Sequence, residues 1–287
     1  MRPVVRSAWM AGRLALLFGL AGCASGNVGL EGLDATLWTQ HSAEYRASAE
    51  QAFRTARQML DVGLADPAWS AAVEQAGDPS TLPPAVILDV DETVLDNSPF
   101  QARLIREERE FNPEMWGRWV EEAQALPVPG ALEFARYAAD RGVRVFYVTN
   151  RDAEHEEATA RNLSRFGFPL DSAADVLLTR GEREGWGSNK STRRAWVAER
   201  HRVVLLAGDD LNDFLPVSRS SLEQRDSLEA EYASYWGVRW IMLPNPAYGS
   251  WEAALYGFDS TLTAEQRRAR KGERLKTDGE RLEEEPR

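Results

Sequence analysis

The chain has 287 residues, with 45 acidic and 34 basic side chains, a formal net charge of −11 and a single cysteine. This length fits one domain of ordinary to large size with a substantial core. The negative charge disfavours binding of polymeric nucleic acid, and one cysteine excludes an internal disulfide and a cysteine-based zinc site.

The first 22 residues have the pattern of a secretory signal peptide. Three arginines lead into an apolar run at residues 14–20, which is followed by small side chains. Such a run is too short for a stable membrane span, but it suits the hydrophobic region of a cleaved signal. We therefore expect residues 1–22 to be removed from the mature protein.

The signal segment ends in the sequence LAGC at residues 20–23, whose last residue, Cys23, is the only cysteine. This sequence resembles the lipobox of bacterial lipoproteins, in which the cysteine is acylated and becomes the first mature residue. The resemblance implies a lipidated stem over residues 23–32 and a protein held at a membrane by its lipid. Because Ala24 stands where an inner-membrane retention signal usually has Asp, the resemblance also implies sorting to the outer membrane of the cell envelope.

The body of the chain alternates between helical and strand patterns. Apolar residues recur at helical spacing over residues 36–60, and further helices are predicted at 130–139 and 191–200. Short apolar runs typical of buried parallel strands lie at residues 85–88, 143–148, 203–207 and 240–243. Strands that alternate with helices predict an α/β fold with a doubly wound, Rossmann-like parallel sheet.

Two segments depart from this alternation. The stretch from about 97 to 142 is longer than one crossover needs and mixes aromatic with charged side chains, so we expect a small helical cap over the active edge of the sheet. Residues 263–287 are dense in Arg, Lys and Glu, which predicts a solvated helix that frays into a disordered tail. The folded domain is therefore expected to span residues 33–262.

Three of the predicted strands end in polar clusters, at the edge where sheets of this kind bind ligands. Asp89 and Asp91 follow the first of these strands and, by alternation, lie on the same side of the chain. One carboxylate can attack phosphorus to form an aspartyl phosphate while the other protonates the leaving oxygen. Thr149 and Asn150 can donate hydrogen bonds to the transferred phosphoryl group, and Lys190 can place a positive charge on it.

The cluster after the third strand predicts a metal site. Asp209, Asp210 and Asp213 add carboxylate oxygens to those that follow the first strand. A shell of oxygen ligands with retained waters suits Mg²⁺. The cation would also offset the repulsion between several carboxylates and an anionic phosphomonoester substrate.

The clusters, in this order, resemble those of the haloacid dehalogenase (HAD) superfamily of phosphohydrolases. Two sequences, ILDVDETVLDN at residues 87–97 and AGDDLNDF at residues 207–214, are similar to the signatures of the bacterial class C acid phosphatases. The similarity extends to residues 37–45 and 243–251, near the two ends of the body. The family consists of envelope lipoproteins, which agrees with the sequence around Cys23, and it implies a HAD-like fold.

The resemblance implies a role for each matching residue. Asp89 would be the nucleophile and a metal ligand, and Asp91 the general acid and base with its backbone carbonyl on the metal. Asp209 would be the remaining protein ligand of Mg²⁺. Thr149 and Lys190 would hold the phosphoryl group.

The family hydrolyses phosphomonoesters broadly, often nucleoside 5′-monophosphates and aryl phosphates, with the ring held between aromatic side chains. Tyr248 matches one aromatic position, and Trp116 or Trp119 is a candidate for the opposite face, with burial in the core as the alternative. Phe100 stands where the family usually has Tyr, which removes a hydroxyl from the pocket wall. A changed substrate preference is the expected consequence.

Two acidic residues near Asp209 leave alternatives open. The resemblance implies that Asp213 orients Lys190, but Asp213 can instead cap the helix that follows it. Asp210 replaces the Asn or Thr that is usual in the family. It adds a charge beside the metal, which we expect to alter the pH optimum or the metal affinity.

Combined, these features predict a lipid-anchored, Mg²⁺-dependent acid phosphatase that acts on small phosphomonoesters through an aspartyl-phosphate intermediate. Two alternatives are a non-catalytic surface binding lipoprotein on the same fold and a phosphotransferase that passes phosphate to an alcohol. The chain retains the full set of predicted catalytic, phosphate-binding and metal-binding side chains, which favours catalysis.

Overall fold

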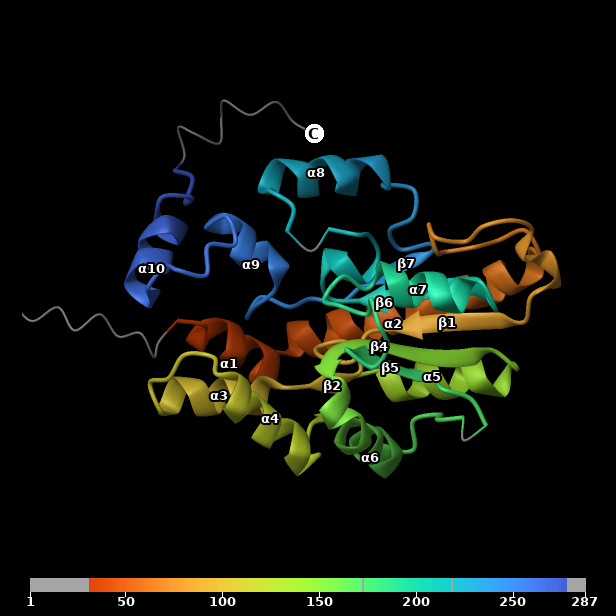
Figure 1. Cartoon of the computed structure of the whole chain (residues 1–287), viewed down its shortest axis with the longest axis horizontal. Helices are drawn as coiled ribbons and strands as arrows, with labels where there is room; N and C mark the ends of the chain where they lie inside the picture. Colours follow the sequence, from red (N-terminus) through yellow and green to blue (C-terminus); the bar gives the residue numbers. More distant parts are fainter. Residues whose placement is uncertain (1–30, 172, 218, 278–287) are drawn as a thin grey trace, which may run out of the picture.

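A five-stranded parallel sheet forms the centre of the computed structural model, which describes residues 31–171, 173–217 and 219–277. The strands lie in the order β5-β4-β1-β6-β7 (Figure 1). Their bounds are β1 Pro84–Leu88, β4 Arg144–Asp152, β5 Leu177–Arg180, β6 Arg202–Gly208 and β7 Trp240–Met242. The predicted α/β fold with a parallel sheet is therefore confirmed.

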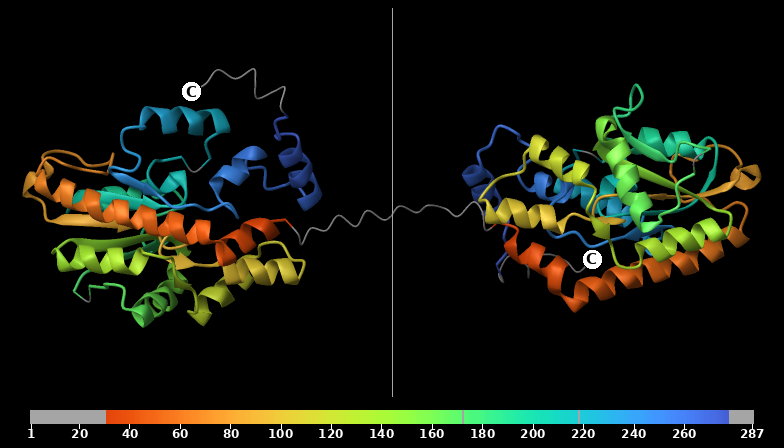
Figure 2. Two further views of the ribbon diagram at one scale, coloured as in Figure 1. Left: turned by 180° about the vertical axis from the view of Figure 1, so that it is seen from behind. Right: turned by 90° about the horizontal axis from the view of Figure 1, so that it is seen from below.

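Helices cover both faces of the sheet because successive strand residues point to opposite sides. In β1, Val86 and Leu88 pack into the core on one face, and Ala85 and Ile87 into the core on the other. The covering helices are, on the first face, α2 (Ala43–Ala65), α5 (Ala131–Asp140) and α6 (Glu156–Phe166), and, on the second, α7 (Ser191–Ala198). Figure 2 shows the long helix α2 beside α5.

Two elements differ from those predicted. The helix expected at residues 36–60 is divided into α1 (Leu33–His41) and α2 by Ser42, whose backbone is extended. The Ser42 hydroxyl accepts a hydrogen bond from the Tyr45 N–H (3.0 Å) and so caps α2. The edge strand β5 was not anticipated, because four residues with only two large apolar side chains give too weak a pattern.

The segment predicted as a cap, about 97–142, is divided between a cap and the core. The cap elements are α3 (Ser98–Arg106), α4 (Pro113–Glu122) and the short antiparallel pair β2 (Leu95–Asp96) and β3 (Leu126–Pro127). Helix α5, in contrast, packs on α2, with the rings of Phe53 and Phe134 5.8 Å apart. The cap is therefore shorter than predicted, since α5 is the crossover helix that returns the chain to the sheet.

The start of the predicted tail is a docked helix, α10 (Ala264–Gly272). Arg267 forms an ion pair with Glu110 in the loop between α3 and α4 (2.7 Å), and Lys271 forms one with Glu252 (2.5 Å). Helix α10 has no buried residue, so these ion pairs take the place of apolar contacts. The helix predicted at the start of the tail is therefore present, and residues 278–287 lie outside the described residues.

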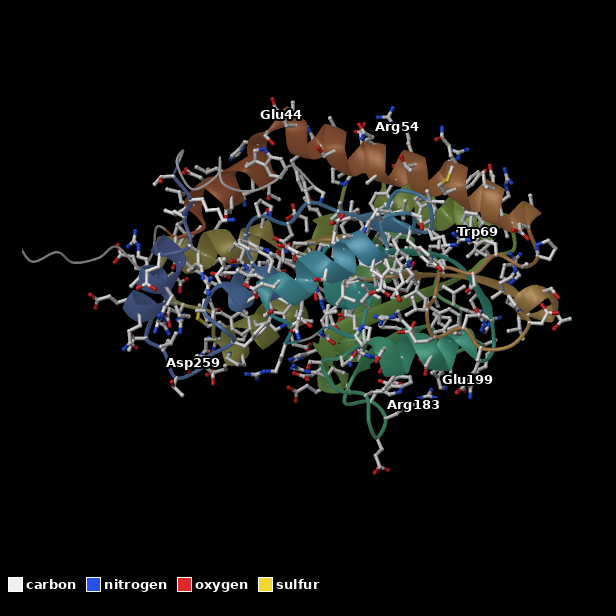
Figure 3. The ribbon with its side chains drawn as sticks, turned by 90° about the horizontal axis from the view of Figure 1, so that it is seen from above. Glu44, Arg54, Trp69, Arg183, Glu199 and Asp259 are labelled. Atoms are coloured by element: carbon white, nitrogen blue, oxygen red, sulfur yellow. The ribbon has the colours of Figure 1, made fainter. Side chains whose placement is uncertain are left out.

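The described residues also form two further helices and three 3₁₀ turns. They are α8 (Leu222–Glu231), α9 (Ser250–Leu255) and the 3₁₀ turns η2 (Pro79–Thr81), η3 (Ala153–His155) and η4 (Leu211–Asp213). Figure 3 shows Glu44 and Arg54 on the outer, charged side of α2. Within the described ranges, no helix combines the length and the apolar character needed to cross a membrane. The predicted signal sequence and Cys23 lie outside the described residues.

Candidate active site

The candidate active site lies at the carboxyl end of β1, where the strand order changes direction. From β1 the chain passes to β4 and β5 on one side of the sheet and then returns to β6 and β7 on the other. The loops after β4 and β6 diverge around the end of β1, which is where such sheets bind ligands. A cavity of about 1010 Å³ opens there and is lined by Asp89, Lys190 and the cap residues Phe100 and Trp116, among others.

Asp89 follows β1 and belongs to a buried charge cluster. Its backbone N–H donates to the carbonyl of Ala207 in β6 (2.9 Å), and the residue is only 6% exposed. Lys190, at the start of α7, donates hydrogen bonds to Asp89 and to Asp213 (2.6 Å for Asp213). Asp213 also accepts the N–H groups of Asp209 (3.1 Å) and Asp210 (2.9 Å). Asp213 therefore orients Lys190, as the resemblance implied, and also closes the capping box of η4, of which it is the last residue. It does not cap the helix that follows, α8, whose N-cap is Ser221.

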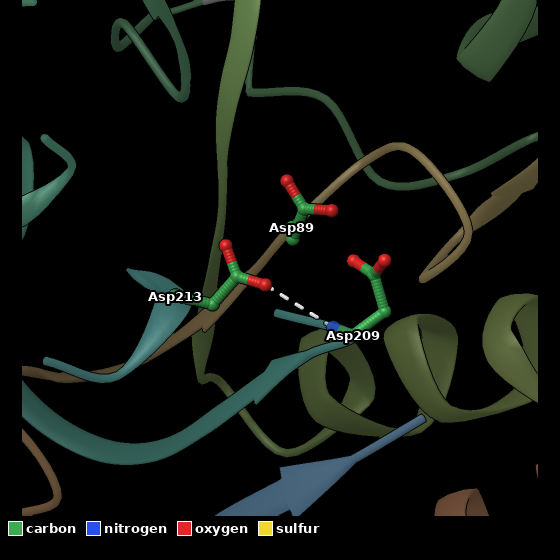
Figure 4. Close-up of side chains that lie close together, drawn as sticks. All are labelled: Asp89, Asp209 and Asp213. Atoms are coloured by element: carbon green, nitrogen blue, oxygen red, sulfur yellow. Dashed lines mark hydrogen bonds between the residues drawn. The ribbon is translucent and has the colours of Figure 1, made fainter. Parts of the chain in front are cut away.

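Three carboxylates share the space beside Asp89. Oxygen atoms of Asp89, Asp209 and Asp213 all lie within 4.8 Å of one another, and the side chains converge in Figure 4. The Asp213 carboxylate already accepts hydrogen bonds from Lys190 and from two backbone N–H groups. Asp89 and Asp209 are therefore the carboxylates that can bind a cation. The Thr93 hydroxyl lies 3.3 Å from Asp89 and 3.4 Å from Asp209, and Asn245 donates to Asp209 (2.7 Å). The carboxylate oxygens of Asp89 and Asp209 are hard ligands of the kind that a divalent cation prefers.

The electrostatics of this cluster also favour a cation. Burial raises the pKa of Asp89 to about 7, with Asp213 and Asp91 adding to the shift and Lys190 opposing it. Burial and the adjacent Asp89 also hold the pKa of Asp209 well above its ordinary value. Burial alone would lower the pKa of Lys190, but Asp213 and Asp89 raise it, so Lys190 stays protonated. One lysine cannot neutralise these carboxylates, and a divalent cation would stabilise their ionised forms.

Asp91 lies beside this cluster and is held by Arg151, a residue to which the sequence assigned no role. The Arg151 Nε (3.0 Å) and Nη2 (2.8 Å) donate to Asp91 Oδ1, and the Asn97 amide donates to the same oxygen (2.8 Å). The Asp91 side chain is 19% exposed and lines the cavity, so it can reach a leaving group. Strand alternation could have identified Arg151, because Thr149 and Arg151 are related as Asp89 and Asp91 are.

Thr149 and Asn150 lie at the end of β4, as predicted, but differ in what they offer. Thr149 is fully buried, and its hydroxyl accepts the N–H of Arg151 (3.1 Å), so the hydroxyl hydrogen can be donated to another group. Asn150 lines the cavity, and its amide N–H₂ donates to the Ser188 carbonyl (3.0 Å). Asn150 therefore helps to fix the loop before α7, which contains both Ser188 and Lys190.

Arg193 organises this side of the site and has no counterpart in the sequence predictions. It is fully buried on α7 and donates to the carbonyl of Thr149, the side-chain oxygen of Asn150 (2.6 Å) and the carbonyl of Gly187 (2.8 Å). Burial lowers its pKa to about 10, so it remains a cation at neutral pH. No sequence pattern marks Arg193, because its contacts join a strand end to a loop that is distant in the chain.

Tyr248 lines the cavity from the segment after β7. Its hydroxyl donates to Glu92, a buried residue whose carboxylate also accepts the backbone N–H (2.9 Å) and side-chain amide (3.0 Å) of Asn97. Burial, followed by the charge of Asp91, raises the pKa of Glu92 to about 8. Glu92 has φ 59°, a left-handed conformation uncommon for residues other than glycine, and these contacts hold it there.

The cap supplies further aromatic side chains to the lining of the cavity. Phe100 and Trp116 line the cavity, with ring centroids 5.2 Å apart, and the exposed ring of Phe111 lines it as well. Trp119 does not line it: this residue is 3% exposed, and its indole N–H donates to Asn97 (2.8 Å). Of the four predicted pocket residues, Phe100, Trp116 and Tyr248 border the cavity and Trp119 does not. Phe100 is also a core residue, since it is only 1% exposed.

The comparison with family models matches residues 31–251 to the model described as HAD superfamily, subfamily IIIB (acid phosphatase). Among solved structures, the chain is similar to the class C acid phosphatase from Bacillus anthracis, with 32% identity and a TM-score of 0.77. The match covers 88% of this chain and 99% of that one. A structure of the Bacillus anthracis enzyme with tungstate bound is similar at 31% identity and a TM-score of 0.76, with the same coverage.

Curated plant proteins are also similar. Acid phosphatase 1 of Solanum lycopersicum is 30% identical over 167 residues, which are 56% of this chain and 57% of that protein. The stem 31 kDa glycoprotein of Glycine max is 24% identical over 166 residues, 56% of this chain and 58% of that protein. The chain thus spans little more than half the length of the curated relatives that it matches.

Proposed function

This chain belongs to the acid phosphatase family of HAD subfamily IIIB, and we propose that it hydrolyses small phosphomonoesters, nucleoside 5′-monophosphates among them. The observation that carries the proposal is the buried pair of Asp89 and Lys190 at the switch point of the sheet, facing a large cavity. A carboxylate at this place can act as nucleophile, and a lysine beside it can bind the anionic group under attack.

The proposed reaction has two steps. First, a carboxylate oxygen of Asp89 attacks phosphorus, and the bond to the leaving oxygen breaks as Asp91 gives that oxygen a proton. Second, water attacks the aspartyl phosphate, the bond from phosphorus to Asp89 breaks, and Asp91 takes the proton of the water. Lys190 and Thr149 bind the other phosphoryl oxygens as charge develops on them. Since Asp91 must carry a proton when the leaving group departs, we expect faster turnover at acid pH.

Mg²⁺ is the cation that we propose for this site. Asp89 and Asp209 would hold it, and their hard oxygen atoms match its preference. The bound ion supplies positive charge that offsets the repulsion between the carboxylates and the phosphoryl group. Arg151 and Asn97 hold the Asp91 carboxylate beside the reacting group throughout.

The walls of the cavity suggest substrates with a flat ring. Phe100 and Trp116 on the cap face the same space as Tyr248 on the opposite segment. Aromatic side chains stack on the faces of nucleobases and aryl groups, with offset or edge-to-face geometry. We therefore propose that the ring of a nucleotide or an aryl phosphate lies between these walls while its phosphate reaches Asp89.

Release of phosphate by the full chain tests the proposed activity. We expect hydrolysis of p-nitrophenyl phosphate, AMP and glycerol phosphate between pH 4 and 8, with a preference for the two aromatic substrates. New phosphomonoester after addition of a nucleoside would identify a phosphotransferase instead. No release of phosphate from protein shown to be folded would contradict the proposal and indicate a non-catalytic binding protein.

We further propose that the protein is lipidated at Cys23 and held at the outer membrane. The support is the sequence alone: a signal pattern over residues 1–22 that is followed by Cys23, the last residue of the sequence LAGC. In cells that express Cys23→Ala, the protein should move from the membrane fraction to the soluble fraction and should lose the mass of the lipid. An unchanged distribution of this variant would contradict lipid anchoring through Cys23.

A further inference from the structure

The segment that carries Tyr248 is fastened to the catalytic loops at three points. Asn245 donates to Asp209 (2.7 Å), and the Tyr248 hydroxyl donates to Glu92. The third point is Ser250, whose backbone N–H and hydroxyl each lie 2.7 Å from an oxygen of Asp210. The first two points lie at residues in or against the charge cluster, whereas the third joins the wall of the cavity to Asp210, which also caps the turn η4.

The contact between Asp210 and Ser250 has a defined polarity. Arg225 on α8 donates to the Ser250 hydroxyl oxygen (2.6 Å). Because arginine can only donate, the hydroxyl accepts from Arg225 and must direct its own hydrogen to Asp210. Asp210 thus receives two hydrogen bonds from Ser250, in addition to the N–H of Asn212 (2.9 Å). An amide side chain could not accept all three, since one of its two polar atoms is a donor.

The backbone between Tyr248 and Ser250 makes this contact decisive for the position of the tyrosine. Gly249 has φ 151° and ψ −179°, a region open in practice to glycine alone. A side chain at this position would lie 2.9 Å from Trp251 and 3.2 Å from the Asp210 carboxylate. The chain therefore turns closely past Asp210, and the Ser250 contact helps to set the position of Tyr248, beside the bonds from the Tyr248 hydroxyl to Glu92 and from its N–H to Asn245 (3.4 Å).

We propose that Asp210 is a specificity-determining positioning residue: through Ser250 it holds Tyr248 where the ring of an aromatic substrate stacks. This inference rests on the proposed phosphatase function and names the part of the substrate that Asp210 serves. Loss of the contact lets the wall move, while the groups that attack and bind phosphorus keep their own hydrogen bonds. Binding of aromatic substrates is weakened, and hydrolysis of aliphatic ones is preserved.

The test compares substrates within each variant. For Asp210→Asn and Ser250→Ala in the full chain, kcat/KM should fall about tenfold for p-nitrophenyl phosphate and AMP, the size expected for one charged hydrogen bond. The loss should lie mainly in KM. For glycerol phosphate, kcat/KM should stay within about twofold. Glu44→Gln, which removes an exposed charge from the outer side of α2, is the matched control and should change kcat/KM for neither class of substrate.

The double variant separates a shared contact from two independent defects. Asp210→Asn combined with Ser250→Ala should cost little more than Asp210→Asn alone, because Ser250→Ala removes only the hydroxyl bond to Asp210, which belongs to the same contact. Equal losses of kcat/KM for aromatic and aliphatic substrates would overturn the proposal and indicate that Asp210 supports the charge cluster instead. If Asp210→Asn does not fold, the proposal is tested by comparing the losses of kcat/KM for aromatic and aliphatic substrates in Ser250→Ala. A wild-type chain without activity on any substrate would instead contradict the proposed function itself.

Discussion

Asp89→Asn should lower kcat for every phosphomonoester by about 10⁴-fold or more, the size of loss seen when an enzyme loses its nucleophile. An amide nitrogen or oxygen cannot replace the attacking carboxylate oxygen, and no other carboxylate of the cluster is free to do so. Asp213 is bonded to Lys190 and two backbone amides, Asp91 is bonded to Arg151, and Asp209 is bonded to Asn245. Initial rates with p-nitrophenyl phosphate, measured with Mg²⁺ at several pH values, check this result.

The same substitution should leave the fold intact. Lys190 keeps its bond to Asp213 (2.6 Å), so no buried cation is left without a partner. Because burial raises the pKa of Asp89 to about 7, the folded protein prefers this carboxyl protonated, and stability falls as the pH rises toward 7 and stays lowered above it. A neutral Asn removes that unfavourable charge, so the melting temperature at pH 8 should be equal to or above that of the wild type. Substantial residual turnover in a folded variant would show that another group attacks phosphorus.

The part of the site that the sequence predicts is the part that follows from strand ends. Asp89, Asp91 and Asp209 come directly after apolar runs, and parallel strands bring their carboxyl ends to one edge. Lys190 was found through its order among the clusters, and the structure brings it to Asp89. The fold class followed from the same alternation of strands and helices, whereas β5 was missed because it is short and lies at the edge of the sheet.

The residues that the sequence could not identify act through contacts between segments far apart in the chain. Arg193 reads as an ordinary helical residue until α7 packs against the end of β4. Asp210 reads as one more acid beside Asp209, but the structure binds its carboxylate to Ser250 and Asn212. The expectation that Asp210 alters the pH optimum or the metal affinity stays a prediction, beside the proposed role of Asp210 in positioning the pocket wall.

The cap shows the same limit of sequence patterns. Trp116 and Trp119 are three residues apart on α4, so they share a helix face and are equivalent by spacing. Only the position of Asn97 separates them: it accepts the indole N–H of Trp119 and donates to Asp91. Trp119 thereby supports the residue that we propose as general acid, and Trp116 remains at the cavity.

Removal of divalent cations should lower turnover by about 10³-fold, since a bound metal ion stabilises the transition state by several kcal/mol and each 1.4 kcal/mol is about tenfold. EDTA should abolish most phosphate release, and Mg²⁺ in excess should restore it. The physical reason is the buried group of Asp89, Asp209 and Asp213, which Lys190 alone does not neutralise.

The same cluster predicts how Mg²⁺ binding depends on pH. The pKa of Asp89 is raised to about 7, and that of Asp209 above its ordinary value, so protons compete with the cation as the pH falls. The ionised carboxyls destabilise the folded state as the pH rises through these values, and Mg²⁺ should offset this effect. Mg²⁺ should therefore raise the melting temperature more at pH 8 than at pH 5, and Asp209→Asn should lose most of the increase. Full turnover in EDTA, or an increase that is larger at pH 5, would show that these carboxylates do not hold the cation.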